Sequence, residues 1–154
     1  MKTNAVRLLD AAGINYELRS YDWDEDTLDA VSVAQTLNIE VDRMFKTLVL
    51  TGTQVRHFVA VVPGNAQLNL KTAARISGNK SCAMLPLKQL LQLTGYVHGG
   101  CSPLGMKKAL PTWIDERALQ HERISVSGGK RGLQIILNPR DLAAAAAAQF
   151  AVFE

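Results

Sequence analysis

The chain has 154 residues, of which 47% are hydrophobic and 20% charged, with a net charge of +3. This length and balance fit one globular domain with one core. No apolar run approaches the roughly 18 residues needed to span a bilayer, which excludes a bilayer-spanning protein. The first residues also lack the apolar core of a secretory signal. We therefore expect a cytoplasmic protein with residues 1–154 as a single domain.

The charge is distributed unevenly along the chain. Residues 1–70 hold six Lys and Arg against nine Asp and Glu, whereas residues 71–131 hold ten against three. A basic middle is what a polyanion partner needs. A solvated lysine-rich surface explains the same charge, so this feature leaves the partner open.

The N-terminal third predicts a helix, a strand and a second helix. Asn4 to Ala12 is helical and ends at Gly13, and residues 16–21 alternate as a strand does. After the acidic segment from Asp22, residues 29–37 predict a helix that buries Val31, Ala34 and Leu37.

The middle of the chain predicts a β-hairpin, with strands at residues 44–50 and 55–62. Asn69 caps a helix that ends at Gly78, and Pro86 suits the first position of a helix that ends near Gly95. Short strands are expected at residues 80–84 and 96–98.

The C-terminal part predicts strands at residues 112–115, 123–126 and 133–137, the last two forming a hairpin. An alanine-rich helix capped by Asn138 or Asp141 follows. These elements predict an α+β fold: a curled, mostly antiparallel mixed sheet of about seven strands surrounded by about five helices.

Lys46 is the only charge in the apolar strand at residues 44–50. Alternation places it on one face with Leu48, and Thr47 on the other face with Phe45. A lone ammonium in such a strand must find a partner, reach solvent at the edge or line a polar pocket. An edge lysine that prevents sheet aggregation is the alternative.

Two glycine-rich loops could present bare peptide groups. Residues 98–105 read HGGCSPLG, and residues 127–132 read SGGKRG on a predicted hairpin tip. Such loops can direct amides at a carbonyl oxygen or an anion, although a plain tight turn has the same composition. Cys101 could act as a nucleophile, but a nearby His98 does not establish thiolate activation.

Familiar catalytic constellations are missing from the sequence. It contains no GxSxG motif and no HExxH motif, and His57, His98 and His121 are scattered. Two cysteines, Cys82 and Cys101, are too few for a disulfide framework or a zinc cluster. We expect no metal and no cofactor.

Taken together, the segments resemble the YbaK/EbsC family of Cys-tRNA(Pro) deacylases, relatives of the editing domain of prolyl-tRNA synthetases. The matching pieces occur in family order across nearly the whole chain. They are FKTL at residues 45–48, LNLK at residues 68–71, TGY at residues 94–96, GGCSPLG at residues 99–105 with Lys107 and Lys108, and VSGGKRGL at residues 126–133.

The resemblance implies a trans-editing enzyme that removes cysteine from Cys-tRNA(Pro), with the cysteinyl thiol attacking its own ester. It implies a catalytic role for Lys46 and an ester-holding GxxxP loop at Gly99–Pro103. The substrate-binding residues it implies are Tyr21, Thr47, Gly99, Gly100, Cys101, Ser102, Pro103, Ser127 and Gly129. For the tRNA we add Lys107, Lys108, Lys130 and Arg131.

The expected partners are aminoacyl-tRNA and, through the family, prolyl-tRNA synthetase, without a membrane or DNA. A non-catalytic tRNA-binding module and a deacylase for alanine remain alternatives. Three positions depart from the family pattern. Relatives commonly carry an aliphatic residue at Cys101, a Phe-Gly pair at Leu28-Asp29, and in some cases an acid at Gln134. The expected site is a cavity in which the Lys46 cation faces the peptide groups of Gly99–Pro103.

Overall fold

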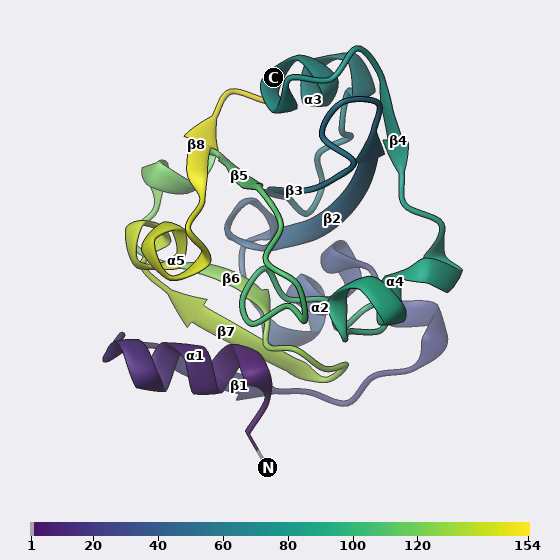
Figure 1. The fold of residues 1–154 in the computed structure, drawn as a ribbon. Helices are drawn as coiled ribbons and strands as arrows, with labels where there is room; N and C mark the ends of the chain where they lie inside the picture. The colour runs from purple at the N-terminus through teal and green to yellow at the C-terminus, as the bar shows by residue number, and fades with distance from the viewer. Residues whose placement is uncertain (1) are drawn as a thin grey trace.

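The computed structural model describes residues 2–154. Within them it contains five α-helices and eight β-strands (Figure 1). The helices are α1 (Asn4–Ala12), α2 (Ala30–Leu37), α3 (Leu70–Ser77), α4 (Leu87–Thr94) and α5 (Pro139–Ala146). The strands are β1 (Glu17–Ser20), β2 (Phe45–Gly52), β3 (His57–Pro63), β4 (Cys82–Met84), β5 (Thr112–Asp115), β6 (Ile124–Ser127), β7 (Leu133–Leu137) and β8 (Gln149–Ala151). Short 3-10 helices are η1 (Glu25–Thr27), η2 (Val41–Arg43) and η3 (Glu116–Gln120).

The strands form two sheets. A five-stranded sheet has the order β4-β2-β3-β5-β8, and a three-stranded sheet has the order β1-β7-β6. The hairpins β2–β3 and β6–β7 are antiparallel, as predicted, whereas β3–β5 and β5–β8 are parallel. A single parallel bridge between Met44 and Ser125 joins the sheets at the start of β2. The α+β class with mixed sheets is confirmed.

The main core lies between the two sheets, where α1 and α5 also pack. Phe45 and Val49 of β2 contribute to it, together with Ile135 of β7. A second core fills the other face of the five-stranded sheet, where Leu50 and Phe58 pack against α3. Figure 1 shows α3 at one end of the molecule and α1 at the other. Strand β2 therefore has apolar surroundings on both faces.

Local sequence signals fix most helix ends. Side chains of Thr3, Asp29, Asn69 and Asn138 accept backbone N–H groups at the starts of α1, α2, α3 and α5. Left-handed residues at Gly13, Gly78 and Gly95 end α1, α3 and α4. Pro86 precedes α4 as its N-cap and is not its first helical residue.

Three further expectations of local structure are wrong. Residues 96–98 form no strand; Tyr96 is buried there, and its hydroxyl donates to the Leu104 carbonyl at 2.7 Å. Val31 is 37% exposed, and Val33 and Ala34 carry the buried face of α2. Strand β8 was not expected, since its short sequence QFA lacks an alternating pattern and gains its place only by pairing with β5.

None of the helices in residues 2–154 is long and apolar enough to cross a membrane.

Candidate active site

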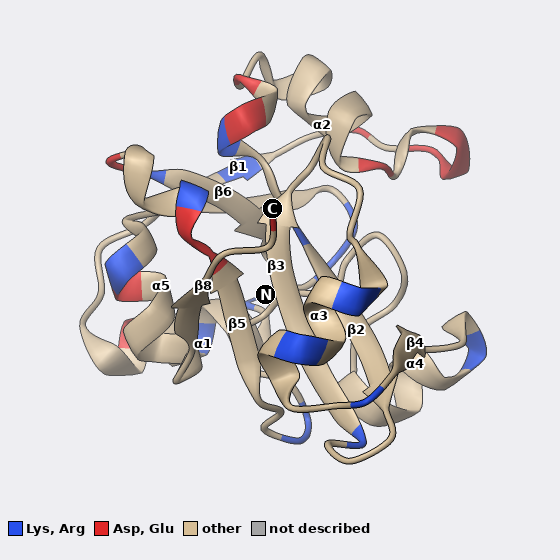
Figure 2. Ribbon diagram, turned by 90° about the horizontal axis from the view of Figure 1, so that it is seen from above, with Lys and Arg blue, Asp and Glu red and all other residues tan. Residues whose placement is uncertain are grey.

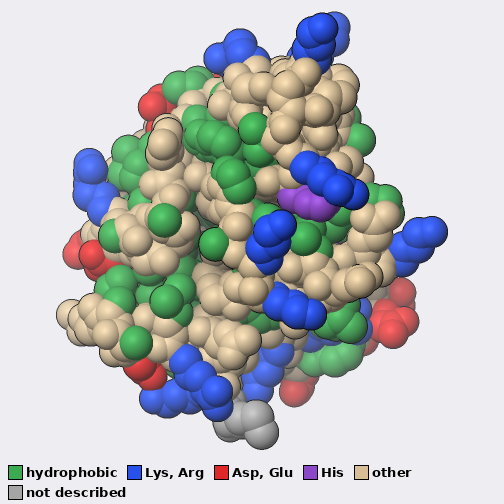
Figure 3. Space-filling model, viewed as in Figure 1, with side chains coloured by type: hydrophobic (Ala, Val, Ile, Leu, Met, Phe, Trp, Pro, Cys, Tyr) green, Lys and Arg blue, Asp and Glu red, His purple; other side chains and the backbone are tan. Residues whose placement is uncertain are grey.

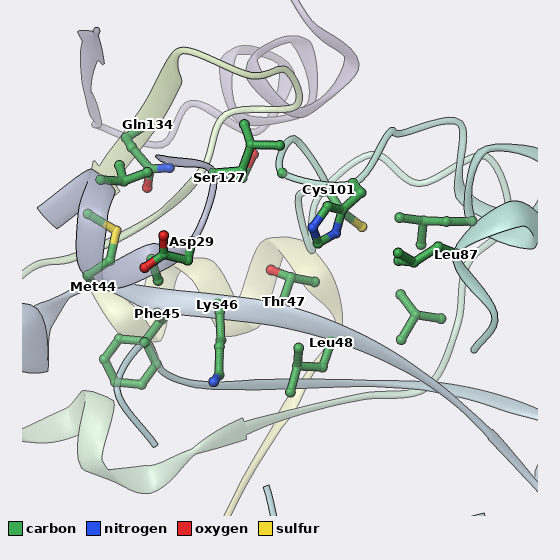
Figure 4. Close-up of a pocket in the computed structure, with 18 of the residues that line it drawn as sticks. Asp29, Met44, Phe45, Lys46, Thr47, Leu48, Leu87, Cys101, Ser127 and Gln134 are labelled. Carbon is green, nitrogen blue, oxygen red and sulfur yellow. The ribbon is translucent and has the colours of Figure 1, made fainter. Parts of the chain in front are cut away.

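A cavity of about 480 Å³ opens between β2, the segment before α2, the start of α4 and the glycine-rich loop after α4. Its wall includes five of the residues predicted to bind substrate, together with Lys46 (Figure 4). These five are Tyr21, Thr47, Gly99, Cys101 and Ser127. Segments far apart in the sequence thus meet at one site.

Lys46 and Thr47 leave β2 on opposite faces, as strand alternation requires (Figure 4). Thr47 points to the side that holds Cys101 and Ser127, whereas Lys46 points to the other side. The sequence predicted that the lysine amine would face the glycine loop. The residue of β2 that projects toward that loop is Thr47.

The Lys46 amine is half-buried and has a defined partner. Its Nζ donates to the carbonyl oxygen of Ala66 at 2.6 Å, in the turn that follows β3. Burial lowers the pKa of Lys46 below its ordinary value. An ammonium has three N–H donors, so two are left beyond the bond to Ala66, on the face of β2 opposite the glycine loop.

Thr47 carries an unsatisfied buried hydroxyl. Its Oγ1 is shielded from solvent and has no hydrogen-bond partner among the described residues. A buried hydroxyl without a partner costs about 1–3 kcal/mol. A ligand in the cavity would supply the missing bond.

The glycine-rich loop is built as a tight turn. Gly99 has a φ of 84°, and the Gly100 amide donates to the Val97 carbonyl at 2.9 Å. Neither the Gly99 amide nor the Cys101 amide donates to another group in residues 2–154. These two amides have no acceptor in the described part of the chain and can donate to a ligand, and the substrate-holding role of the loop stays a prediction.

Four predicted substrate-binding residues lie outside the cavity wall. Gly100 packs on the backbone of the hairpin tip at Lys130, and Gly129 packs against Tyr96 and Thr3. Pro103 is buried, and Ser102 accepts the Leu104 amide through its Oγ at 3.2 Å. These residues support the wall from behind and hold the loop to the hairpin.

Arg131 joins the hairpin tip to the glycine-rich loop at His98, a residue of the cavity wall. Its Nε donates to the His98 carbonyl at 2.8 Å, and its guanidinium lies 5.1 Å from the centre of the Trp23 ring. Lys130 beside it is exposed. Of this predicted tRNA-binding pair, Lys130 is exposed to solvent, whereas Arg131 is already held by its contacts with His98 and Trp23.

The other predicted tRNA-binding residues, Lys107 and Lys108, are exposed in the loop before β5. Figure 3 shows Lys and Arg side chains spread over this face, without a single compact patch. Acidic residues gather before and after α2 (Figure 2). A polyanion is therefore favoured on the loop side and disfavoured beside α2.

Cys101 has the environment of an inert buried thiol. Its side chain is 9% exposed and belongs to the main core. Burial raises the pKa of the thiol to about 12. A protonated thiol is a poor nucleophile, so Cys101 contributes to the wall by its shape.

Five polar wall residues were not predicted as binding residues: Glu25, Asp26 and His98, and the two at departures from the family pattern, Asp29 and Gln134. Asp29 accepts the Ser32 amide and hydroxyl as the N-cap of α2, and its carboxylate borders the cavity. Gln134 is 5% exposed, and its Oε1 accepts from Ser125 Oγ at 2.8 Å. Both positions depart from the family pattern, and that departure was their only signal in the sequence.

Comparison with known proteins supports the resemblance. Residues 24–145 match the family model described as the aminoacyl-tRNA editing domain. The chain is 49% identical over 150 residues to EbsC of Enterococcus faecalis, named as a candidate Cys-tRNA(Pro)/Cys-tRNA(Cys) deacylase. That alignment covers 97% of this chain and 92% of the relative.

Solved structures agree with the fold. A candidate trans-editing enzyme for prolyl-tRNA synthetase superposes with a TM-score of 0.81 at 25% identity, covering 100% of this chain and 98% of that one. The hypothetical protein APE2540 superposes with a TM-score of 0.87 at 21% identity, covering 97% of each chain, and supports the fold alone. The family match spans most of the chain and includes the strand, the glycine loop and the hairpin that build the cavity. This chain therefore belongs to the aminoacyl-tRNA editing domain family.

Proposed function

We propose that this protein is a trans-editing deacylase that removes cysteine from mischarged Cys-tRNA(Pro). The observation that carries the proposal is the cavity beside β2. There the cavity wall holds the unpartnered hydroxyl of Thr47 and two loop amides without a protein acceptor, beside a space that suits an ester-linked amino acid, while the Lys46 ammonium lies on the opposite face of β2. Membership of the editing family supplies the aminoacyl-tRNA class of substrate.

The proposed reaction uses the nucleophile of the substrate. The cysteinyl sulfur bonds to its own carbonyl carbon, the bond from that carbon to the ribose oxygen breaks, and the proton from sulfur goes to the ribose oxygen. The tRNA leaves, and water opens the cyclic thioester to give cysteine. The protein lowers the barrier by holding the attacking shape and stabilising the negative oxygen.

Different residues serve different parts of this step. The Gly99 and Cys101 amides and the Thr47 hydroxyl donate toward the carbonyl oxygen as negative charge develops on it. Lys46 lies on the opposite face of β2, where its Nζ donates to the Ala66 carbonyl, and we propose that this bond fixes β2 and the turn after β3 beside the cavity. Tyr21 and Ser127 complete the wall.

The test is release of cysteine from Cys-tRNA(Pro) by the purified protein and by Lys46→Ala. We expect turnover by the wild type and loss of it in the mutant, and normal turnover by the mutant would remove Lys46 from the mechanism. An S-methylcysteinyl-tRNA should resist cleavage because its sulfur cannot attack. Salt-sensitive tRNA binding without cleavage of any aminoacyl-tRNA would support a non-catalytic binding module instead.

Specificity is tested with Cys-, Ala- and Ser-charged tRNA(Pro) and with Cys-tRNA(Cys). A thiol-dependent step predicts strong preference for cysteine, whereas efficient release of alanine would require attack by water. We further propose that the enzyme works in the cytoplasm and obtains its tRNA from prolyl-tRNA synthetase. Co-purification of the synthetase with the protein and charged tRNA would test that partner.

A further inference from the structure

The cavity presents hydrogen-bond acceptors and donors on different elements. The Asp29 carboxylate, at the start of α2, is an acceptor on the cavity wall. Donors come from the other walls: the free amides of Gly99 and Cys101 and the side-chain amide of Gln134. Asp29, Thr47, Ser127 and Gln134 lie on the same side of β2 (Figure 4).

Gln134 adds a side-chain amide donor to this side of the cavity. The residue is only 5% exposed, and Ser125 Oγ occupies its Oε1. Its Nε2 donates to no group in residues 2–154 although the residue lines the cavity. Together with the unpartnered Thr47 hydroxyl, this gives two polar groups on the cavity wall that lack a protein partner.

We propose that Asp29 binds the free α-ammonium of the aminoacyl group and makes the enzyme selective for substrates whose amino group is unmodified. The inference rests on the proposed function and adds a specificity-determining residue to it. An α-amino ester has one cationic donor, the ammonium, next to one acceptor, the carbonyl oxygen. The carboxylate matches the first and the amide donors match the second.

The carboxylate is suited to this task at neutral pH. Hydrogen bonds from the Ser32 hydroxyl and amide lower the pKa of Asp29 and fix its orientation. Asp29 is exposed and is paired in none of the ion pairs among the described residues. Its charge is therefore available to a cation that enters the cavity.

The selectivity has a consequence for the class of substrate. An acylated amino nitrogen is neutral and bulkier, so it loses the charge-assisted bond to Asp29. Peptidyl-tRNA and other N-acylated aminoacyl-tRNAs would then be spared, whereas a newly mischarged aminoacyl-tRNA would be accepted.

The experiment uses a hydrolysis-resistant probe, cysteine joined through an amide to the 3′ position of 3′-amino-3′-deoxyadenosine. Its affinity is measured by calorimetry with the amino group free and with the amino group acetylated. We expect the wild type to prefer the free amine by about tenfold or more, as befits one charge-assisted bond. In Asp29→Asn the preference should fall to about twofold or less.

The control keeps the same chemistry at another site. Asn caps a helix as well as Asp does, so Asp29→Asn should leave α2 intact, which circular dichroism checks. Asp24→Asn changes the cap of η1, and Asp24 lies outside the cavity wall, so this variant should retain the wild-type preference.

Several outcomes would overturn the proposal: equal affinity of the wild type for both probes, an unchanged preference in Asp29→Asn, or no binding of either probe. Deacylation of Cys-tRNA(Pro) is measured separately. If the wild type prefers the free amine but releases no cysteine, the editing function is wrong and the ammonium site is supported. If it releases cysteine but shows no preference for the free amine, the ammonium site is wrong and the editing function is supported.

Discussion

The backbone of Gly100 lies directly against that of Lys130, so that a Cβ added to Gly100 would be 2.9 Å from the Cα and carbonyl carbon of Lys130. This contact joins the glycine loop to the tip of the β6–β7 hairpin. We expect Gly100→Ala to separate the two loops, lower the free energy of unfolding by about 1–3 kcal/mol and reduce cysteine release. Denaturant unfolding and deacylation kinetics measure the two effects.

Gly13→Ala is a suitable control for that change. A Cβ at Gly13 meets nothing within 4 Å, and the residue's positive φ of 69° alone makes alanine unfavourable, by about 1–2 kcal/mol. This variant should lose stability yet keep its specific activity once folded. If Gly100→Ala is as active as Gly13→Ala, the contact between the loops does not shape the site.

The sequence predicted most elements because their signals are local. The Thr3 and Asn69 caps, the β2–β3 alternation and the glycine ends all act within a few residues. The parallel pairing of β5 and β8 escaped prediction, because it joins residues more than thirty positions apart and depends on tertiary packing.

The candidate site was predicted as a set of segments but not as a geometry. Alternation in β2 predicted that Lys46 and Thr47 lie on opposite faces, yet the sequence could not show which face meets the glycine loop. It also could not show that Ala66 receives the Lys46 amine or that Asp29 shares a cavity with Gln134. Those contacts depend on how distant segments pack.

Cys101 is expected to be dispensable for the chemistry. Its thiol is buried with a pKa raised to about 12, so little thiolate is present at neutral pH. Cys101→Ser and Cys101→Ile should retain kcat/KM for Cys-tRNA(Pro) within about fivefold, a loss of about 1 kcal/mol. A variant that is folded by circular dichroism but inactive would instead indicate a nucleophile supplied by the protein.

The half-buried charge of Lys46 should lower the free energy of unfolding at pH values below the pKa of its amine. Burial lowers its pKa, so the folded state releases the lysine proton before the unfolded state does. The unfolded chain then binds more protons over that interval, and stability rises with pH there. The cost of the buried charge is fully present below the folded pKa and is relieved as pH approaches the ordinary value of 10.5.

The comparison of wild type with Lys46→Met isolates this contribution. The free energy of unfolding of the wild type should rise relative to that of the mutant as the pH increases toward 10.5. The mutant should release no cysteine at any pH. Urea unfolding at a series of pH values measures the difference. A constant difference would mean that the amine is as well solvated in the folded chain as in the unfolded one.

The exposed pair Lys107 and Lys108 is expected to strengthen tRNA binding by neutralising backbone phosphates. Replacing both with Glu should weaken tRNA binding and reduce the salt dependence of the binding constant, by about 0.7–0.9 in log–log slope for each phosphate that the variant no longer neutralises. Replacing Lys71 and Arg75 of α3 with Glu makes the same charge change on the far side of the five-stranded sheet. Equal effects of the two pairs would indicate attraction by net charge alone.

Thr47→Val should separate stability from activity most clearly. Valine has nearly the same shape and removes the Oγ1 that has no partner in the described chain, so the free energy of unfolding should rise by up to about 1–3 kcal/mol. Deacylation should fall, because the hydroxyl is a donor to the carbonyl oxygen in the proposed reaction. Thr112→Val is the matched control: its hydroxyl donates to the Leu110 carbonyl at 2.9 Å, so this change should cost about 1 kcal/mol and spare activity. Were Thr47→Val destabilised to the same degree as Thr112→Val, with normal kinetics, the Thr47 hydroxyl would be part of the fold and not of the site.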